Sequence, residues 1–367
     1  MKKYAHNLLI CFLFGVTSCQ TIDQLSIDYL VPSDVSFPVE LRRVAIVNNT
    51  SSLHTNEVIT DSPEKLPNEL ARQTSYPEGD AVLAAEVMAE SIAEENYFDK
   101  VVICDSVLRA SDRFARESTL SKEEVIQLTR ELDVDFLISL ENLQMKAVRI
   151  IRFDPVFGGY EGVVDVKVYP TVKIYLPSRS TPMVTIATHD SIFWQESGAT
   201  EQYVRSRLVS ATQMAKEASA FAGTVPVQKL IPHWKTSTRY LYTGGSAGMR
   251  DAYVQTRRDK WDEACTLWLQ IYETKKPRQQ MGAAYNIAVY YEMQDEIEKA
   301  EEWLFRAQEL SRKVDKVESK SAESGNRVEA SRVPNYAMTV IYMQELQDRK
   351  NHLAKLNMQM KRFENDF

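Results

Sequence analysis

The chain has few of the residues that build disulfide frameworks and metal centres. Its 367 residues include four cysteines, five histidines and 12 glycines. Four cysteines cannot form the disulfide framework of a protein this long. The sequence also contains no H-E-x-x-H motif, no His/Cys spacing suited to zinc and no phosphate-binding G-x-x-x-x-G-K-[ST] loop. We therefore expect neither a metal ion nor a cofactor.

Positive charge is also scarce. The chain has 44 Lys and Arg residues against 51 Asp and Glu residues, a formal net charge of −7 and a pI near 5.5. Because nucleic-acid phosphates are bound by concentrated Lys and Arg, this balance argues against a nucleic-acid partner. A hydrophobic share of 44% excludes wholesale disorder. The length suits one large domain or two ordinary ones.

The start of the chain lacks an apolar run long enough to cross a membrane. Lys2 and Lys3 precede an apolar run of nine residues at 8–16, whereas a spanning helix needs about 20 residues. A positive start, a short apolar run and small residues behind it are typical of a secretory signal peptide. We place this signal peptide at residues 1–18.

The sequence Val16-Thr17-Ser18-Cys19 resembles the lipobox of bacterial lipoproteins. In that family the peptide is cut before the cysteine, which is then acylated, so the resemblance implies lipid attachment at Cys19 and a durable membrane anchor. Gln20 stands where Asp would resemble an inner-membrane retention signal, which favours the outer membrane. The alternative is an ordinary signal peptide with a chance cysteine. We expect the remaining Cys104 and Cys265 to be buried thiols rather than a disulfide.

The middle of the chain alternates between strand and helix patterns. Residues 19–40 indicate a lipid-anchored tether, and residues 41–243 indicate an α/β domain with a long polar surface loop at 50–78. The patterns predict strands at 42–49, 101–104, 136–153, 166–176, 183–195 and 239–243, and helices at 80–96, 121–132 and 200–221. This order predicts an α+β fold whose mixed, largely antiparallel sheet is packed with helices.

Four short sequences in this domain match a known arrangement. They are Val44-Ala45-Ile46-Val47, Asn96-Tyr97-Phe98, Lys100-Val101-Val102-Ile103 and Val134-Asp135-Phe136-Leu137-Ile138. Their order resembles the periplasmic α/β domain shared by the curli-secretion lipoprotein, the peptidoglycan-synthase activator lipoproteins and the N-terminal part of the Tol-system propeller protein. The resemblance spans about residues 42–222, departs at the loop 50–78, and implies a non-catalytic docking module.

Internal repetition dominates the rest of the chain. Ala264 and Trp268 recur 36 residues later as Ala300 and Leu304. The unit Ala284-x-x-Ile287-Ala288-x-x-Tyr291, followed by Ala300-x-x-x-Leu304-x-x-Ala307, resembles a tetratricopeptide repeat. We predict an all-α tail with two such repeats at residues 244–311, although the first helix departs from the family pattern. The alternative is two unrelated helical hairpins.

A polar linker at residues 312–334 and a C-terminal helix at 335–367 complete the predicted tail. The helix carries an apolar stripe formed by Tyr342, Leu346, Leu353, Leu356, Met360 and Phe363. We interpret this stripe as a cap on the repeat stack, because two repeats are fewer than a self-supporting solenoid usually needs. A helix that docks a partner is the alternative.

The repeat resemblance also implies a binding groove. In tetratricopeptide arrays the first helix of each pair lines the concave face on which partner peptides lie. Carried over by the 36-residue register, the resemblance implies partner-binding roles for Met249, Tyr253, Arg257, Tyr285 and Met293. The alternative is that the α/β domain or the terminal helix covers these side chains, which would make the two tyrosines core residues.

The sequence Gly244-Gly245-Ser246-Ala247-Gly248 matches the G-x-S-x-G nucleophile elbow of hydrolases. Such enzymes place their acid and histidine on later strands, but the sequence after Gly248 indicates helices, and His352 is the only histidine there. We therefore interpret the segment as a flexible interdomain hinge.

Together these features favour a non-enzymatic, lipid-anchored protein of the cell envelope, placed at the outer membrane, that acts as a protein-protein interaction scaffold or assembly factor. Its expected partners are envelope proteins. A glycan-binding surface lipoprotein is the main alternative, and a serine hydrolase using Ser246 is the least favoured one.

Overall fold

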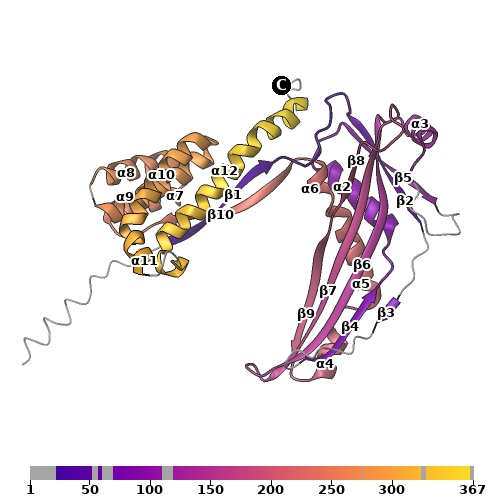
Figure 1. The fold of residues 1–367 in the computed structure, drawn as a ribbon, viewed down its shortest axis with the longest axis horizontal. Coiled ribbons are helices and arrows are strands. Elements are labelled where there is room, and N and C mark those ends of the chain that lie inside the picture. The colour runs from indigo at the N-terminus through magenta and orange to yellow at the C-terminus, as the bar shows by residue number, and fades with distance from the viewer. Residues whose placement is uncertain are drawn as a thin grey trace, which may run out of the picture. The chain divides into compact units, whose positions relative to one another are not determined.

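The computed structural model describes residues 22–51, 57–59, 69–109, 119–274, 276–323 and 328–363 (Figure 1). The predicted signal peptide and the predicted lipid attachment at Cys19 lie outside the described residues. The chain divides into two compact units. The helical unit contains the described residues up to Val31 together with Trp234–Leu356, and the sheet unit contains Pro32–His233 together with the described residues from Asn357 onward.

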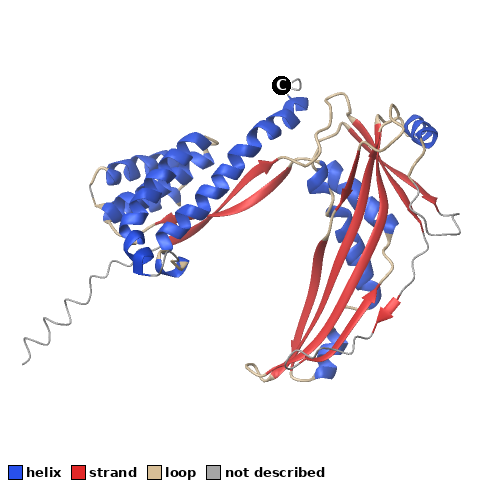
Figure 2. Cartoon of the chain, in the orientation of Figure 1, coloured by secondary structure: helices blue, strands red, loops and turns tan. Residues whose placement is uncertain are grey.

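Eight strands of the sheet unit form one sheet (Figure 2). They are β2 (Arg43–Ser51), β3 (Glu57–Ile59), β4 (Glu69–Tyr76), β5 (Lys100–Arg109), β6 (Phe136–Asp154), β7 (Gly159–Tyr175), β8 (Val184–Ala187) and β9 (Asp190–Gly198). β2 pairs in parallel with β5 and β6, whereas β6 pairs antiparallel with β4 and β7, and β7 antiparallel with β8 and β9. The predicted fold class, with a mixed and largely antiparallel sheet, is confirmed.

The described residues of this unit form five helices: α2 (Ala81–Glu94), α3 (Lys122–Glu131), α4 (Glu201–Arg207), α5 (Ala211–Thr224) and α6 (Val227–Leu230). β2 carries the continuous apolar run Val44-Ala45-Ile46-Val47 because it is covered on both faces. Val44 and Ile46 pack with α2 and α5 in the main core, whereas Ala45 and Val47 pack with Val125 of α3 on the opposite face. The predicted capping box of α3 is present, with Ser121 and Glu124 each accepting a hydrogen bond from the other's backbone N–H.

The helical unit begins with a two-stranded ribbon of β1 (Ile22–Val31) and β10 (His233–Tyr242). Its helices are α7 (Ala247–Thr256), α8 (Trp261–Tyr272), α9 (Pro277–Met293), α10 (Ile297–Val314), α11 (Val317–Glu323) and α12 (Pro334–Met360), with 3₁₀ turns η1 (Ala330–Arg332) and η2 (Lys361–Phe363). Asp259 and Asp295, at equivalent places in the turns after α7 and α9, have φ angles of 60° and 58°. This repeated left-handed turn lies 36 residues apart, as the predicted register requires.

The predicted tether is wrong for Ile22–Val31, which forms β1. Leu25, Ile27 and Tyr29 alternate with exposed polar residues, and Ile27 and Tyr29 are buried within the helical unit. The Tyr29 hydroxyl lies 3.3 Å from the Ser237 hydroxyl of β10. Because the pairing partner lies some two hundred residues further along the chain, no local turn signal marks this strand.

Three further boundaries differ from the sequence predictions. In the structure the units divide between His233 and Trp234, so β10, apart from His233, packs within the helical unit. The predicted loop 50–78 includes strand β4, which β6 holds in an antiparallel ladder although its sequence has few β-branched residues. The predicted linker 312–334 includes the end of α10 and the helix α11.

The C-terminal end of α12 has a different role from its main part. Gln359 donates hydrogen bonds to the carbonyl oxygens of Ser33 and Val35, at 3.0 and 2.8 Å. Arg362 donates to the carbonyl of Tyr97 at 2.8 Å, and its guanidinium lies 4.0 Å from the centroid of the Tyr97 ring. All five residues belong to the sheet unit, so α12 begins in one compact unit and its last residues belong to the other.

Candidate functional site

The groove predicted on the repeats is occupied by the protein itself. Met249 and Tyr285 are each only 1% exposed, so the interpretation of these two residues as an open partner site is wrong. The Tyr285 ring packs against Tyr242 of β10 and Tyr342 of α12, each at a centroid distance of 5.3 Å. The alternative that the terminal helix covers the groove is therefore confirmed.

The end of β10 lies in this groove as an extended peptide would. The Asn286 side chain accepts a hydrogen bond from the backbone N–H of Tyr242 at 2.9 Å and donates one to its carbonyl at 2.8 Å. A Cβ atom at Gly282 would meet Tyr242 Cβ at 3.2 Å, so the bare glycine permits this close approach. A side-chain amide that both accepts from and donates to one backbone residue is a contact typical of peptide recognition. Here the bound peptide is β10 of the same chain.

The other three predicted groove residues have different surroundings. Tyr253 is half-buried and its hydroxyl donates a hydrogen bond to the Asp23 carboxylate of β1, which lowers the pKa of Asp23. Arg257 is exposed at the C-terminal end of α7, and Met293 is partly buried at the end of α9. A partner-binding role for these three residues stays a prediction.

A buried cluster of charges holds α12 over the groove. Arg239 of β10 donates two hydrogen bonds to the Glu292 carboxylate of α9, at 2.7 and 2.8 Å, and Tyr342 of α12 donates a third at 2.7 Å. Arg349 of α12 adds a fourth at 3.2 Å, and Arg239 also pairs with Glu345. The side chains of Arg239 and Glu292 are 2% and 0% exposed, so three separate elements meet at one desolvated ion pair.

The pKa values in this cluster follow from its geometry. Burial by itself raises the pKa of the Glu292 carboxyl, but the hydrogen bonds and charge of Arg239 outweigh burial and bring that pKa below its ordinary value. Burial also opposes the charge of Arg239, and the bonds and charge of Glu292 nevertheless raise its pKa. Both groups therefore stay ionised. The cluster links β10, α9 and α12 by ion pairs and hydrogen bonds, and its charged groups are paired with one another.

The Ser246 hydroxyl has a structural partner. It caps α7 by accepting a hydrogen bond from the backbone N–H of Met249 at 3.2 Å. The segment before it joins β10 to α7 inside the helical unit, so in the structure it does not connect the two compact units, and a hinge there stays a prediction. The sequence matched the elbow motif because a tight strand-to-helix turn and a capped helix start use the same small residues.

The tip of the β6–β7 hairpin exposes two large apolar side chains. Val156 and Phe157, which we call the hairpin tip, are 85% and 87% exposed. Asp154 accepts hydrogen bonds from the backbone N–H groups of both residues, at 2.8 and 3.3 Å, and Gly158 adopts a φ of 65°. These contacts define one turn conformation, so the tip is a fixed feature of the hairpin.

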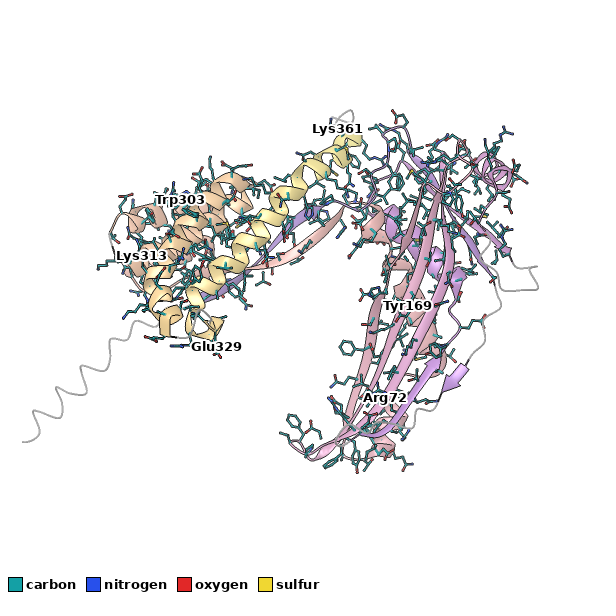
Figure 3. All side chains as sticks on the ribbon, in the orientation of Figure 1. Arg72, Tyr169, Trp303, Lys313, Glu329 and Lys361 are labelled. Carbon is teal, nitrogen blue, oxygen red and sulfur yellow. The ribbon has the colours of Figure 1, made fainter. Side chains whose placement is uncertain are left out.

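A partly apolar face of the sheet carries exposed aromatic residues along the same hairpin. Phe193 of β9 is 64% exposed and Tyr169 of β7, seen at mid-height in Figure 3, is 37% exposed. Strand register puts Val148, Ile150 and Val163 on the same face. The helix α4 packs on the opposite face, where a Cβ at Gly162 would meet Val204 and Leu208. This face and the hairpin tip were not singled out from the sequence, although two apolar residues inside an Asp-Pro…Gly-Gly turn are an available signal.

The prediction of a buried thiol holds for Cys265, whereas Cys104 is only partly buried. Cys104 and Cys265 are free thiols in different units, and burial raises the pKa of the Cys265 thiol to about 11. Across the described ranges no three His, Cys, Asp or Glu side chains are grouped so as to hold a metal ion. Every helix in these ranges is too short or too polar to cross a lipid bilayer.

Two family models match the chain. Residues 41–242 match the model described as Domain of unknown function (DUF8603), which is more than half of the sequence. The chain belongs to this family. Residues 250–348 match a second model, Domain of unknown function (DUF6340), which runs from α7 into α12. The search of the curated proteins returned no match to this chain.

Proposed function

We propose that the protein is a non-enzymatic, lipid-anchored scaffold of the outer membrane that docks a protein partner through its hairpin tip. The observation that supports this most is the exposure of Val156 and Phe157, at 85% and 87%. Large apolar side chains at such exposure are costly to keep in water, and contiguous ones mark interaction sites. Lipid attachment at Cys19, from the lipobox resemblance, would supply the anchor.

The tip has the properties of a binding hot spot. Aromatic residues dominate the energy of protein interfaces when they enter a pocket on the partner. Because the Asp154 hydrogen bonds and Gly158 define the backbone of the turn, little backbone conformational entropy is lost when Phe157 is buried. The rings of Phe153 and Tyr160, 5.3 Å apart, support the hairpin directly behind the tip. The partner we expect offers an apolar pocket for the Phe157 ring.

The surroundings of the tip are polar and carry charges of both signs. A depression of about 520 Å³ beside Phe157 is lined by the carboxylates of Asp154 and Glu161 and by Gln195, with no basic residue in its lining. Glu161 pairs with Arg152 of β6, whose side chain is 57% exposed, so the local charge is mixed. A polar rim around the partner's apolar pocket would complement these groups.

The repeats are a weaker candidate for the docking role. Their groove is filled by Tyr242 and covered by Tyr342, both of which are buried. The sheet unit, in contrast, leaves Phe157, Tyr169 and Phe193 exposed along one hairpin and its neighbouring strand. We therefore place the interaction surface on the sheet unit.

The test compares three forms of the acylated protein, isolated from its native envelope with a mild detergent. The wild type should co-purify with a defined complex. The double variant Val156→Ser, Phe157→Ser should lose that complex without a change in melting temperature, because neither side chain contacts the core. Phe305→Ser, which alters an aromatic residue of α10 that is 57% exposed, is the matched control and should keep the complex. Retention of the complex by the tip variant would reject the proposal.

A further inference from the structure

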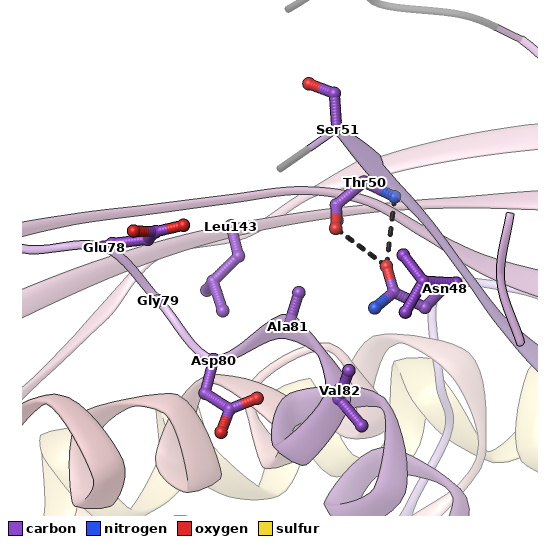
Figure 4. Close-up of a pocket in the computed structure, with 10 residues that line it drawn as sticks. Asn48, Thr50, Ser51, Glu78, Gly79, Asp80, Ala81, Val82 and Leu143 are labelled. Carbon is purple, nitrogen blue, oxygen red and sulfur yellow. Dashed lines mark hydrogen bonds between the residues drawn. The ribbon is translucent and has the colours of Figure 1, made fainter. Parts of the chain in front are cut away.

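A cavity of about 400 Å³ lies between the end of β2 and the start of α2 (Figure 4). Its lining residues are Asn48, Thr50, Ser51, Glu78, Gly79, Asp80, Ala81, Val82, Val107 and Leu143. All belong to the sheet unit. The volume is at the small end of the range of ligand pockets and is large enough for a single sugar ring.

The cavity lies where sheets with parallel strands usually bind ligands. β2 runs parallel to both of its neighbours, β5 and β6, and the cavity opens at the carboxyl end of β2. Crevices at the carboxyl ends of parallel strands are the usual ligand positions. The ladder between β2 and β5 is irregular at Asn48, with register shifts on both sides of this residue. Such irregularities re-aim side chains near functional sites.

Asn48 has an unused donor directed into this space. The residue is 4% exposed, and its side-chain oxygen accepts hydrogen bonds from the N–H and the hydroxyl of Thr50, at 3.0 and 2.7 Å. Its amide nitrogen has no hydrogen-bond partner among the described residues and points into the cavity in Figure 4. The nitrogen is not one of the fully buried atoms that lack a partner, so it can be reached from the cavity and can donate to a ligand oxygen.

Further polar groups surround the same space. Ala81 and Val82 are the first residues of α2, and the first N–H groups of a helix have no partner within the helix. Thr50 and Ser51 add hydroxyl groups. Val107 and Leu143 add an apolar wall. The cavity therefore combines hydrogen-bond donors, hydroxyl groups and a small apolar surface.

The charges of the lining select the class of ligand. Glu78 and Asp80 are acidic and none of the lining residues is basic, which disfavours phosphates and carboxylates. The N–H donors of Asn48 and α2 disfavour an ammonium group at the inner end. A neutral molecule with several hydroxyl groups satisfies both conditions, because each hydroxyl donates to carboxylates and accepts from N–H groups.

We propose that this cavity binds a neutral polyhydroxy molecule the size of a monosaccharide, with the Asn48 amide donating a hydrogen bond to one of its oxygens. This site lies apart from the hairpin tip in the sequence and in its lining residues, and it does not depend on the docking proposal.

Saturation-transfer NMR on the whole protein tests the site with glucose, galactose and N-acetylglucosamine as neutral probes. Glucose 6-phosphate and glucosamine serve as the anionic and cationic counterparts of glucose. The wild type should bind at least one neutral sugar at millimolar concentration, and the charged counterparts should bind more weakly. Competition between neutral sugars should show that they share one site.

Three variants locate the binding. Asn48→Asp keeps an acceptor for Thr50 but removes the amide donor. It should lower the affinity for the sugar about tenfold or more. Ala81→Leu, which places a larger apolar side chain in the cavity, should abolish binding. Glu86→Gln, on an exposed position of the same helix, should have no effect. Lack of binding by every neutral sugar, equal binding of glucose 6-phosphate, or unchanged binding in both cavity variants would overturn the proposal.

Discussion

The carboxylate of Glu292 receives hydrogen bonds from two guanidinium groups and one phenol while being 0% exposed. Glu292→Gln would remove the buried carboxylate shared by Arg239 and Arg349 and leave them only their more exposed partners, Glu345 and Asp295. Removing one partner of a buried ion pair typically costs about 3–5 kcal/mol. We expect urea unfolding of the helical unit to show a loss of this size. Glu302→Gln, in an exposed pair with Arg306, is the control and should change stability by less than about 1 kcal/mol.

The same residue predicts acid sensitivity. The pKa of Glu292 is lower in the folded protein than in the unfolded chain, so its contribution to stability is complete above the unfolded value of about 4.3. That contribution is lost as the pH falls through the lower, folded value. As the pH falls below about 5, the free energy of unfolding of the wild type should therefore fall more steeply than that of Glu292→Gln. Parallel pH profiles of the two proteins would contradict the assignment.

Substitutions at Ser246 distinguish a role in capping α7 from a role in catalysis. Ser246→Ala removes the hydrogen bond to Met249 N–H at the start of α7 and should cost about 1 kcal/mol, as cap substitutions do. Ser246→Asp keeps a capping acceptor and should retain most of this stability. A fluorophosphonate probe should not label the wild type at Ser246. Labelling at that residue would revive the hydrolase interpretation.

At the scale of elements, the packing of α12 and β10 against α9 predicts that Tyr285→Ala and Tyr253→Ala differ in their effect on stability. Tyr285→Ala should lower the free energy of unfolding by about 3–5 kcal/mol, because its ring fills the space between Tyr242 and Tyr342. Tyr253→Ala removes one hydrogen bond at a half-buried position and should cost about 1–2 kcal/mol. Thermal melting of the single variants measures both. Equal, small effects would mean that the groove is open after all.

The elements differ in how far the sequence predicts them. Ser121 and Glu124 predict the start of α3 because the capping box is local, and the 36-residue register predicts the matching turns at Asp259 and Asp295. β1 was missed because its partner is β10, far along the chain. The Arg239–Glu292 pair was missed for the same reason, since single charges scattered over three elements carry no periodic signal.

At the scale of the whole molecule, the two units use their surfaces differently. The predicted partner residues Met249 and Tyr285 are used to hold the helical unit together, whereas Phe157 remains exposed on the sheet unit. The sequence indicates a turn between β6 and β7, but the exposure of Phe157 in that turn depends on the length of the two strands and on what packs beside them. Burial of this kind is a property of the assembled fold and has no signature in a short sequence window.

Membrane attachment gives a prediction for the complete protein. Cys19→Ala should move the protein from the membrane fraction into the soluble fraction, because the substitution removes the proposed acyl chains. Cell fractionation with detection of the C-terminus measures this. An unmodified N-terminus in mass spectrometry of the mature wild type would contradict the lipoprotein proposal.

Docking through the hairpin tip is tested most directly by placing the photo-crosslinking residue p-benzoylphenylalanine at position 157 in cells that make the acylated protein. A second protein with the same residue at position 305, on the exposed face of α10, is the control. We expect ultraviolet light to produce one discrete protein adduct from position 157 that position 305 does not produce. A product containing only lipid, or no adduct at position 157 while the wild-type complex is intact, would contradict the docking proposal.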